Sequence, residues 1–467
     1  MKLNKDIYRL SVLFIIGLFT LSSCGDDRSN EAKELQEVQQ WIYKTMEEHY
    51  LWNDEIPPRE KLNFFEEPKT FFGKLLSKND GNENGPYSYI ENKNDIPSTR
   101  GIPQTEYSYG ISFAYVTIKD ITGEFALVQY ISKDKNSPAY KTNLKRGDLI
   151  SEIDGEKINN KNITKLLGDG EIQIKTSKIS GSSIIPEKTI NLEAARKIDE
   201  NPVYIVRKLI ENKVGYLMYN QFERGKNNDP EDTTYDDALK QAIRELQGVE
   251  DLILDLRYNN GGYVTSAELL ISLIGPRSIL GTKIGYMKSN KGEETSLEAK
   301  DHGINLDLKR LYVITSGTTA SASELIINCL RTDIPIHVIG LTTTGKNVGS
   351  NGFVFKKQPN WVIHPITMQI YNKKGQSDYK DGFNPGIYES GKPNLTNENY
   401  IIKEELPLGD IGNPKTERLL QHTLRIMGYS LDGASTRATD TQDIKTYQIK
   451  EIDNSANRRR ANNFIFD

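Results

Sequence analysis

Between residues 200 and 430, apolar runs of strand length alternate with stretches of helical length, and this alternation constrains the fold more than any other feature. The runs 214–219 and 252–256 are apolar at nearly every position, which is typical of buried strands. Further strands are expected at 310–315 and 336–340, and helices at 266–273 and 322–330. Strands that alternate with helices favour an α/β core, here a mixed sheet with helices.

The segment 34–105 is expected to be a helical N-terminal region. Apolar residues recur there at steps of three and four; they are Leu35, Val38, Trp41, Ile42, Met46 and Tyr50. Pro57-Pro58 is expected to end this helix, and a second helix is expected to begin near Pro68. Residues 79–105 are rich in Asn, Gly, Pro and Asp, which favours a loop or boundary.

Residues 106–195 contain short apolar runs separated by turn signals, a pattern that favours a small β-rich module. Two of its stretches, Tyr109–Phe113 and Ser137–Gly155, resemble parts of a PDZ domain in the expected order. PDZ domains bind a peptide as an added strand and hold its C-terminal carboxylate on backbone amides. The resemblance implies a carboxylate-facing loop formed by Gly110, Ile111, Ser112 and Phe113.

The first 23 residues have the pattern of a bacterial signal peptide. Two lysines precede an apolar run at 10–19, which is too short to span a bilayer comfortably. Leu21-Ser-Ser-Cys24 resembles a lipobox, which implies that Cys24 is lipidated, whereas an uncleaved membrane helix is the alternative. We expect 1–23 to be a lipoprotein signal peptide and 24–33 a tether. The protein would then be exported and lipid-anchored to the cell envelope, at the periplasmic or surface face of a Gram-negative outer membrane.

Charge and cysteine content narrow the possible functions. The chain has 60 Lys and Arg against 64 Asp and Glu, so no global basic field for nucleic acid is present. Cys24 and Cys329 are the only two cysteines, so no disulfide framework or Cys-x-x-Cys metal site is available. Cys329 lies in an apolar stretch and is expected to be buried.

The last residues, 431–467, are polar and are expected to form a flexible tail.

Ser321 lies where a strand is expected to end and a helix to begin. A serine at such a junction can expose its hydroxyl, and the next backbone N–H can point at a developing negative charge. The same pattern also suits an ordinary helix N-cap, where serine is favoured. The local sequence alone therefore leaves both interpretations of Ser321 open.

Lys346 follows Gly345 after an apolar strand. A serine hydroxyl is a weak nucleophile until a base removes its proton. A lysine can be that base only where burial lowers its pKa from about 10.4 toward neutrality. The preceding strand and Leu341–Thr344 could enclose this side chain, and an exposed lysine in a turn is the alternative.

The motif Leu254–Gly262 ends a buried strand with a polar, glycine-rich turn, the place where α/β proteins put ligand sites. Gly261 or Gly262 could present a backbone N–H to an oxyanion, paired with the N–H of Ala322. An ordinary turn at the end of a strand is the alternative.

Taken together, three motifs resemble those of the C-terminal processing peptidases, also called tail-specific proteases. They are the Asp-Leu-Arg-x-Asn-x-Gly-Gly strand end, the Ser-Ala-Ser-Glu helix start and the Gly-Lys pair, in the same order and spacing. The resemblance covers about residues 35–430 and includes a PDZ module ahead of the core. It implies a serine-type endopeptidase with its α/β peptidase core at 200–430.

The resemblance also implies a role for each matching residue. Ser321 would be the nucleophile, and Lys346 the base that activates it and later protonates the leaving amine. Ala322 and one of Gly261 or Gly262 would form the oxyanion hole. The supporting residues would be Glu324 and Arg257.

Two positions depart from the family pattern. The family commonly has Gln four residues after the lysine, where this chain has Ser350, which puts a third catalytic residue in doubt. It also commonly has Pro-Asp where this chain has Pro385-Gly386, which puts the local geometry in doubt.

Other enzyme classes fit less well. Gly340–Lys346 matches the spacing of a nucleotide-binding loop, but Asn347 stands where Ser or Thr must hold magnesium. The five histidines are scattered without a His-Glu-x-x-His motif, so we expect no metal or other cofactor. A Ser-His-Asp triad stays open, although no histidine lies in a recognisable motif.

The main alternative is a catalytically silent, membrane-anchored scaffold that binds peptides through the PDZ groove. The missing Gln motivates it, and the presence of both Ser321 and Lys346 argues against it. The expected partners are protein or peptide substrates and, through the lipid, a membrane. The natural substrate and the oligomeric state do not follow from the sequence.

Overall fold

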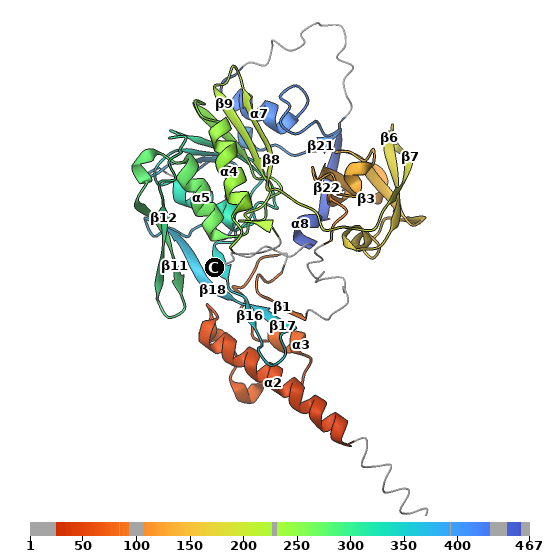
Figure 1. The fold of residues 1–467 in the computed structure, drawn as a ribbon, viewed down its shortest axis with the longest axis vertical. Helices are drawn as coiled ribbons and strands as arrows, with labels where there is room; N and C mark the ends of the chain where they lie inside the picture. Colours follow the sequence, from red (N-terminus) through yellow and green to blue (C-terminus); the bar gives the residue numbers. More distant parts are fainter. Residues whose placement is uncertain are drawn as a thin grey trace, which may run out of the picture. The chain divides into compact units, whose positions relative to one another are not determined.

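The computed structural model describes residues 25–83, 85–92, 107–226, 231–392, 394–429 and 446–458. These residues form two compact units. The first combines the described residues up to Asn92 with Gly352–Ile366, and the second contains the others. Figure 1 shows the helices and strands coloured along the sequence. Cys24 and the predicted signal peptide lie outside the described residues.

Helices and a small antiparallel sheet make up the first unit. Its elements are α2 (Gly25–His49), η1 (Asn53–Glu55), η2 (Arg59–Lys61), α3 (Pro68–Gly73), β1 (Tyr89–Asn92), β16 (Phe353–Val354) and β17 (Trp361–His364). The strand order is β1-β17-β16. Helix α3 begins at Pro68, as predicted, because the Glu67 side chain accepts the Thr70 N–H at 3.0 Å and proline needs no acceptor there.

Helix α2 differs from its prediction at both ends. It begins at Gly25, inside the segment predicted as a tether, and ends at His49, well before Pro57-Pro58. Its early end has a non-local cause, because the N–H of Leu51 donates to the carbonyl of Ile366 at 2.8 Å instead of continuing the helix. No helix in the described part of the chain is long and apolar enough to cross a membrane.

The second unit is built around a seven-stranded mixed sheet with the order β20-β19-β14-β13-β10-β9-β8. Neighbouring strands from β9 to β14 run parallel, and the three outer strands are antiparallel. The bounds are β8 (Val203–Leu209), β9 (Val214–Tyr219), β10 (Asp251–Asp255), β13 (Leu311–Thr315), β14 (Ile336–Gly340), β19 (Gly386–Tyr388) and β20 (Leu395–Thr396). The predicted α/β core with a mixed sheet is confirmed.

Helices cover both faces of this sheet, which explains its continuous apolar runs. The helices are α4 (Thr234–Glu245), α5 (Val264–Ile274), α6 (Ala322–Leu330) and α7 (Arg418–Ile426). In β9, Leu217 packs in one cluster with residues of α4, α5 and α6, whereas Tyr216 and Met218 pack in another with residues of α7. Alternate side chains of a strand point to opposite faces, so both faces of β9 are buried.

A smaller four-stranded sheet of this unit has the order β12-β11-β18-β15. Its strands are β11 (Thr282–Ser289), β12 (Glu294–Ala299), β15 (Val348–Ser350) and β18 (Ile366–Asn372). Strand β15 begins two residues after Lys346, so this sheet and β14 of the large sheet together fix the two ends of the turn that carries the lysine.

The predicted β-rich module is present as a third sheet with the order β21-β22-β2-β3-β4-β6-β7, to which β5 adds beside β4. The bounds are β2 (Ile111–Ile118), β3 (Ile121–Ile131), β4 (Leu149–Ile153), β5 (Glu156–Lys157), β6 (Ile172–Ser180), β7 (Ser183–Leu192), β21 (Glu405–Leu406) and β22 (Tyr447–Asn454). Within the PDZ-like stretch Ser137–Gly155, the chain forms a single 3-10 turn, η3 (Ala139–Lys141).

The C-terminal residues differ from the predicted flexible tail. β22 pairs with β2, and a short helix α8 (Ser455–Arg458) follows it. The polar sequence of this segment does not predict a strand. β22 forms because it pairs with an edge strand whose residues lie more than 300 positions earlier in the chain. Sequence periodicity reports local burial and carries no signal for such pairing.

Candidate active site

Ser321 lies at the junction of β13 and α6, as the last residue before the helix. Its backbone is held at φ 61° and ψ −117°, a region that costs a non-glycine residue about 1–3 kcal/mol. The residue is completely buried, and its Oγ has no hydrogen-bond partner among the described residues. Ser321 is also the N-cap residue of α6, and the Glu324 side chain accepts its N–H as in a capping box. An ordinary cap does not require a strained backbone, so the strain favours a reactive group.

Glu324 joins the serine junction to the lysine turn. Its Oε2 accepts the N–H of Ser321 at 2.9 Å and the N–H of Lys346 at 2.8 Å. Its Oε1 accepts the N–H of Gly345 at 2.7 Å and the hydroxyl of Thr343 at 2.5 Å. One buried carboxylate therefore holds both predicted catalytic residues by their backbones, on a single oxygen atom.

The pKa of Glu324 is raised to about 7. Burial is the main cause, and the hydrogen bonds from Thr343 and the three backbone N–H groups oppose it only in part. The ionised form accepts all four donors at once, whereas a protonated carboxyl group carries a hydrogen that one of them must face. The loops that carry Ser321 and Lys346 are therefore sensitive to pH near neutrality.

Lys346 is 4% exposed, which is the enclosed position that a lysine base requires. It lies in the turn between β14 and β15, and its neighbour Asn347 is fixed through hydrogen bonds from Nδ2 to Ser377. Ser350 occupies the position where the family commonly has Gln. It is buried, and its Oγ has no hydrogen-bond partner among the described residues.

The glycine-rich turn after β10 passes directly beside the serine. A Cβ added to Gly261 would lie 2.7 Å from the Ser321 Cβ and 3.1 Å from its Oγ. The N–H of Gly261 donates to the Asn259 side chain at 2.9 Å and is therefore already used. The N–H groups of Gly262 and Ala322 donate no hydrogen bond within the part of the chain that the structure describes.

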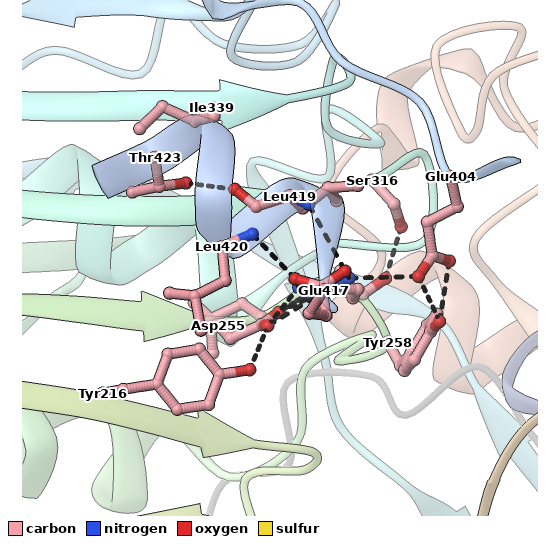
Figure 2. A network of polar contacts seen from close by, with 12 residues as sticks. Tyr216, Asp255, Tyr258, Ser316, Ile339, Glu404, Glu417, Leu419, Leu420 and Thr423 are labelled. Atoms are coloured by element: carbon pink, nitrogen blue, oxygen red, sulfur yellow. Dashed lines mark hydrogen bonds and ion pairs between the residues drawn. The ribbon is translucent and has the colours of Figure 1, made fainter. Parts of the chain in front are cut away.

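Arg257 is the centre of a buried ionic network at the end of β10, and Figure 2 labels its partners Asp255, Glu404 and Glu417. The guanidinium donates to Asp255 at 2.6 Å, to Glu417 at 2.9 Å and to Glu404 at 3.0 Å. Its backbone carbonyl accepts the hydroxyl of Ser316, which lies in the loop before Ser321. Arg257 thus ties the glycine-rich turn to the serine loop by structure and touches neither Ser321 nor Lys346 through any hydrogen bond in the described chain.

The network continues into the β-rich module through Arg146. This side chain donates to Glu404 at 2.6 Å and to the Tyr258 hydroxyl at 2.7 Å. Burial alone would raise the pKa of Glu404, but the positive charges of Arg146 and Arg257 outweigh it and lower the pKa to about 2. One carboxylate therefore pairs with two arginines from different modules.

The predicted carboxylate-facing loop lies where β2 begins. Gly110 has φ 77°, and a Cβ there would lie 2.0 Å from the Ser137 Oγ, so only glycine fits. Ile111 opens β2 beside Ile131 of β3. The Ser112 hydroxyl donates to Gln129 at 3.0 Å. The fourth member of the predicted loop, Phe113, donates its N–H to the Ser455 Oγ at 3.0 Å, so the loop already has a partner.

Several residues of this site were not singled out from the sequence. Asn259 was only a motif position, yet its side chain decides which glycine N–H is free; Glu404 and Glu417, which neutralise Arg257, were not considered at all. The acidic residues lie about 150 positions after Arg257, and a single sequence carries no signal for such a pairing.

Histidines and metal ligands do not gather at this site. Within the described ranges, no cluster of three or more His, Cys, Asp or Glu residues could hold a metal ion. His337 stacks on Tyr312, and its pKa is lowered to about 4, mainly by burial and then by the charge of Arg310. Cys329 is buried as predicted, which raises the pKa of its thiol to about 12.

These features define a site in an α/β core in which a strained serine and a buried lysine are held by one carboxylate. Two parts of the chain are similar to peptidase family S41. The family description "Peptidase family S41" matches residues 213–388, and "Peptidase S41 N-terminal domain" matches residues 37–89. The two matches fall in the α/β core and in the helical N-terminal region.

Curated relatives agree with this assignment. A carboxy-terminal-processing protease of Bartonella bacilliformis is 27% identical over 278 residues, which are 57% of this chain and 59% of the relative. A CtpA-like serine protease of Staphylococcus aureus is 23% identical over 353 residues, which are 72% of this chain and 66% of the relative. The chain therefore spans less than two thirds of the length of these relatives.

A solved structure extends the similarity to the fold. A Bacteroides fragilis protein described as an S41 protease is 28% identical and superimposes with a TM-score of 0.66. The match covers 83% of this chain and 97% of that chain.

Proposed function

We propose that this protein is a serine-type endopeptidase of the C-terminal processing class, with Ser321 as nucleophile and Lys346 as general base. One observation carries the proposal: the N–H groups of Ser321 and Lys346 share the Glu324 Oε2, at 2.9 and 2.8 Å. The unused Oγ of Ser321 and the burial of Lys346 add the chemistry that a nucleophile and a base need.

Ala322 and Gly262 are proposed as the oxyanion hole. Ala322 is the first residue of α6, so its N–H has no acceptor within the helix and lies at the positive end of the helix dipole. Of the two glycines, Gly262 is the better donor because Asn259 already binds the N–H of Gly261. Gly261 serves instead by letting the turn approach the Ser321 side chain.

The reaction would proceed through an acyl-enzyme. Lys346 takes the proton of Ser321 as Oγ attacks the peptide carbonyl, and the two backbone N–H groups stabilise the oxyanion. The proton passes from Lys346 to the leaving amine, and water then releases the acyl group by the same path in reverse. A base must be deprotonated to act, so turnover should rise with pH. These side chains need no metal, so EDTA should leave turnover unchanged.

Substrate capture and membrane anchoring belong to the same proposal. The β-rich module would bind the tail of a protein substrate as an added strand and deliver an upstream segment to Ser321. Lipidation at Cys24 would hold the enzyme at an envelope membrane. Metabolic labelling with a fatty acid tests the anchor, because Cys24→Ala should not incorporate the label.

The test of function is cleavage of casein, an unstructured protein, by the chain without residues 1–24. Ser321→Ala and Lys346→Ala serve as matched variants. The proposal predicts cleavage by the unmodified chain only. Equal cleavage by all three would mean a contaminant or a different nucleophile.

A catalytically silent peptide-binding scaffold is the second candidate, and Ser350 favours it. This residue stands in place of the family's Gln, and its buried Oγ binds nothing in the described chain. Peptide binding without any turnover of casein or of a tail-derived peptide would support the scaffold.

A further inference from the structure

Strand β22 covers the edge of β2 in the β-rich module. The two strands are antiparallel, with Ala114 opposite Asn454 and Ile118 opposite Ile449. The other edge of β2 is paired with β3, so β22 takes the only edge of β2 at which a strand could be added. Figure 1 labels both β22 and the α8 helix that follows it.

The direction of β22 is that of a bound peptide. Moving along β22 from Tyr447 to Asn454, the chain advances along β2 toward the loop at Gly110. A peptide that adds to this edge with its C-terminal end toward that loop runs the same way. The chain's own segment therefore lies in the position and orientation proposed for a captured substrate tail.

Side-chain hydrogen bonds at the C-terminal end of this segment add to the strand pairing. The Ser455 Oγ accepts the N–H of Phe113 at 3.0 Å, inside the predicted carboxylate-facing loop. The Asn454 amide donates to the Thr318 hydroxyl at 2.8 Å, and the Asn260 amide donates to the carbonyl of Ala456 at 3.0 Å. Thr318 precedes Ser321 in its loop, and Asn260 precedes Gly261, so the segment links the peptide edge to the catalytic loops.

Backbone pairing contributes more to this docking than apolar burial does. Four of the eight residues of β22 are exposed, including Lys450 and Glu451, and Ile452 is 48% exposed, whereas Asn454 is buried. Only Tyr447 and Ile449 pack partly against the nearest apolar cluster. Any extended peptide can offer the same backbone donors and acceptors, so another strand can replace β22 without the loss of a large apolar contact.

We propose that residues 446–458, the tail segment, occupy the peptide-binding edge in cis and compete there with substrate. This proposal rests on the proposed function for its effect on turnover. An intramolecular competitor lowers the fraction of molecules with a free edge, and the apparent dissociation constant of substrate rises in inverse proportion to that fraction. A substrate strand that displaces the tail segment also releases Thr318 and Asn260 beside the catalytic serine.

The first test measures binding without catalysis. Fluorescein-labelled peptide 446–456 is titrated into the Ser321→Ala chain, either full-length or ending at residue 445. The proposal predicts saturable binding to the shortened chain and at least about tenfold weaker binding to the full-length chain, as expected if the edge is free about a tenth of the time. Equal affinity for both chains would overturn it. Because Ser321→Ala is used, this result does not depend on the proposed function.

The second test keeps the chain full-length. Asn454→Ala and Ser455→Ala each remove a contact of the tail segment, and Lys450→Ala, at an exposed position of the same strand, is the matched control. With casein as substrate, the first two variants should lower KM several-fold with kcat little changed, and the control should match the unmodified chain. An unchanged or higher KM in both variants would contradict competition. Shortening of the purified chain that Ser321→Ala does not undergo would make the segment a substrate and also overturn the proposal.

Discussion

Gly261 is the residue at which one methyl group tests the geometry of the site. A Cβ there would lie 2.7 Å from the Ser321 Cβ, so Gly261→Ala must displace the serine. A displacement of about 1 Å can lower turnover about 100-fold, so we expect kcat on casein to fall by about that factor with KM little changed. Steady-state kinetics measures both constants.

The matched control for this change is Gly281→Ala. Gly281 also has a positive φ, 75°, but no atom lies within 4 Å of an added Cβ. Gly281→Ala should lower the free energy of unfolding by about 1 kcal/mol, because alanine is strained in a left-handed backbone, and should leave kcat unchanged. Full activity in Gly261→Ala would contradict the placement of this glycine beside the nucleophile.

At the same scale, the sequence predicted the residue types of the site better than their individual roles. Ser321 and Lys346 stand out because motif spacing marks them. The choice between Gly261 and Gly262 depends on which N–H the Asn259 side chain takes, and both glycines look alike in the sequence. The predicted roles of all these residues stay predictions until their variants are measured.

At the scale of elements, Glu324 couples the first turn of α6 to the turn between β14 and β15. Its pKa of about 7 predicts that turnover rises as pH increases through 7, because only the carboxylate accepts all four donors. Glu324→Gln should lose this inflection and lower kcat, since an amide has one acceptor oxygen. A pH–rate profile from pH 5 to 9 measures both effects.

Glu268→Gln is the control, because Glu268 is a half-buried carboxylate that accepts the N–H of Glu298 and no group of the catalytic loops. The pH–rate profile of Glu268→Gln should keep the inflection near pH 7. A bend near pH 7 that persists in Glu324→Gln and disappears when a histidine is replaced would favour a triad instead of the dyad.

The raised pKa of Glu324 makes turnover rise with pH but makes the stability of the fold fall with pH. A pKa raised from 4.5 to about 7 means that the folded state binds more protons than the unfolded state between these values. The contribution of Glu324 to the free energy of unfolding is therefore full below pH 4.5 and is lost as pH rises through 7, by about 3 kcal/mol in total. Conditions that favour activity thus lower the stability of the fold, because the carboxylate that accepts the four donors is a buried charge.

Glu404 shows the reverse dependence. Its folded pKa of about 2 lies below the usual 4.5, so its contribution is present above pH 4.5 and is lost as pH falls through 2. We expect Glu404→Gln to lower the free energy of unfolding by about 3 kcal/mol at pH 7 and by much less near pH 2. Urea denaturation at several pH values measures this difference.

Glu405→Gln is the neighbouring control for this prediction. Glu405 pairs with Arg418, whose side chain is 42% exposed, so its loss should cost under about 1 kcal/mol. A pH-independent effect of Glu404→Gln would contradict the assigned role of Arg146 and Arg257.

Prediction of the elements succeeded where burial is local and failed where pairing is distant. β9, β14 and α6 have the predicted bounds because continuous apolar runs or helical spacing mark them. The early end of α2 and the existence of β22 depend on partners far along the chain, Ile366 and β2 respectively. Short-range patterns cannot report such partners.

At the scale of the whole molecule, all the proposed catalytic residues lie in the second unit. The α/β core supplies the serine, the lysine and the glycine turn, and Arg146 links the β-rich module to the same ionic network. A PDZ-like capture site, a lipid anchor and the envelope location extend this arrangement as proposals. The similarity to S41 peptidases and the fold class were both accessible from the sequence because they rest on motif order and apolar periodicity.

Covalent labelling of the nucleophile tests the central claim most directly. The chain is treated with a fluorophosphonate, which phosphonylates activated serines with loss of fluoride, and the modified residue is mapped by tryptic mass spectrometry. We predict one adduct, on Ser321, that forms much more slowly in Lys346→Ala and is absent in Ser321→Ala. An adduct on another serine, or cleavage of casein by Ser321→Ala at the unmodified rate, would contradict the assignment of the dyad.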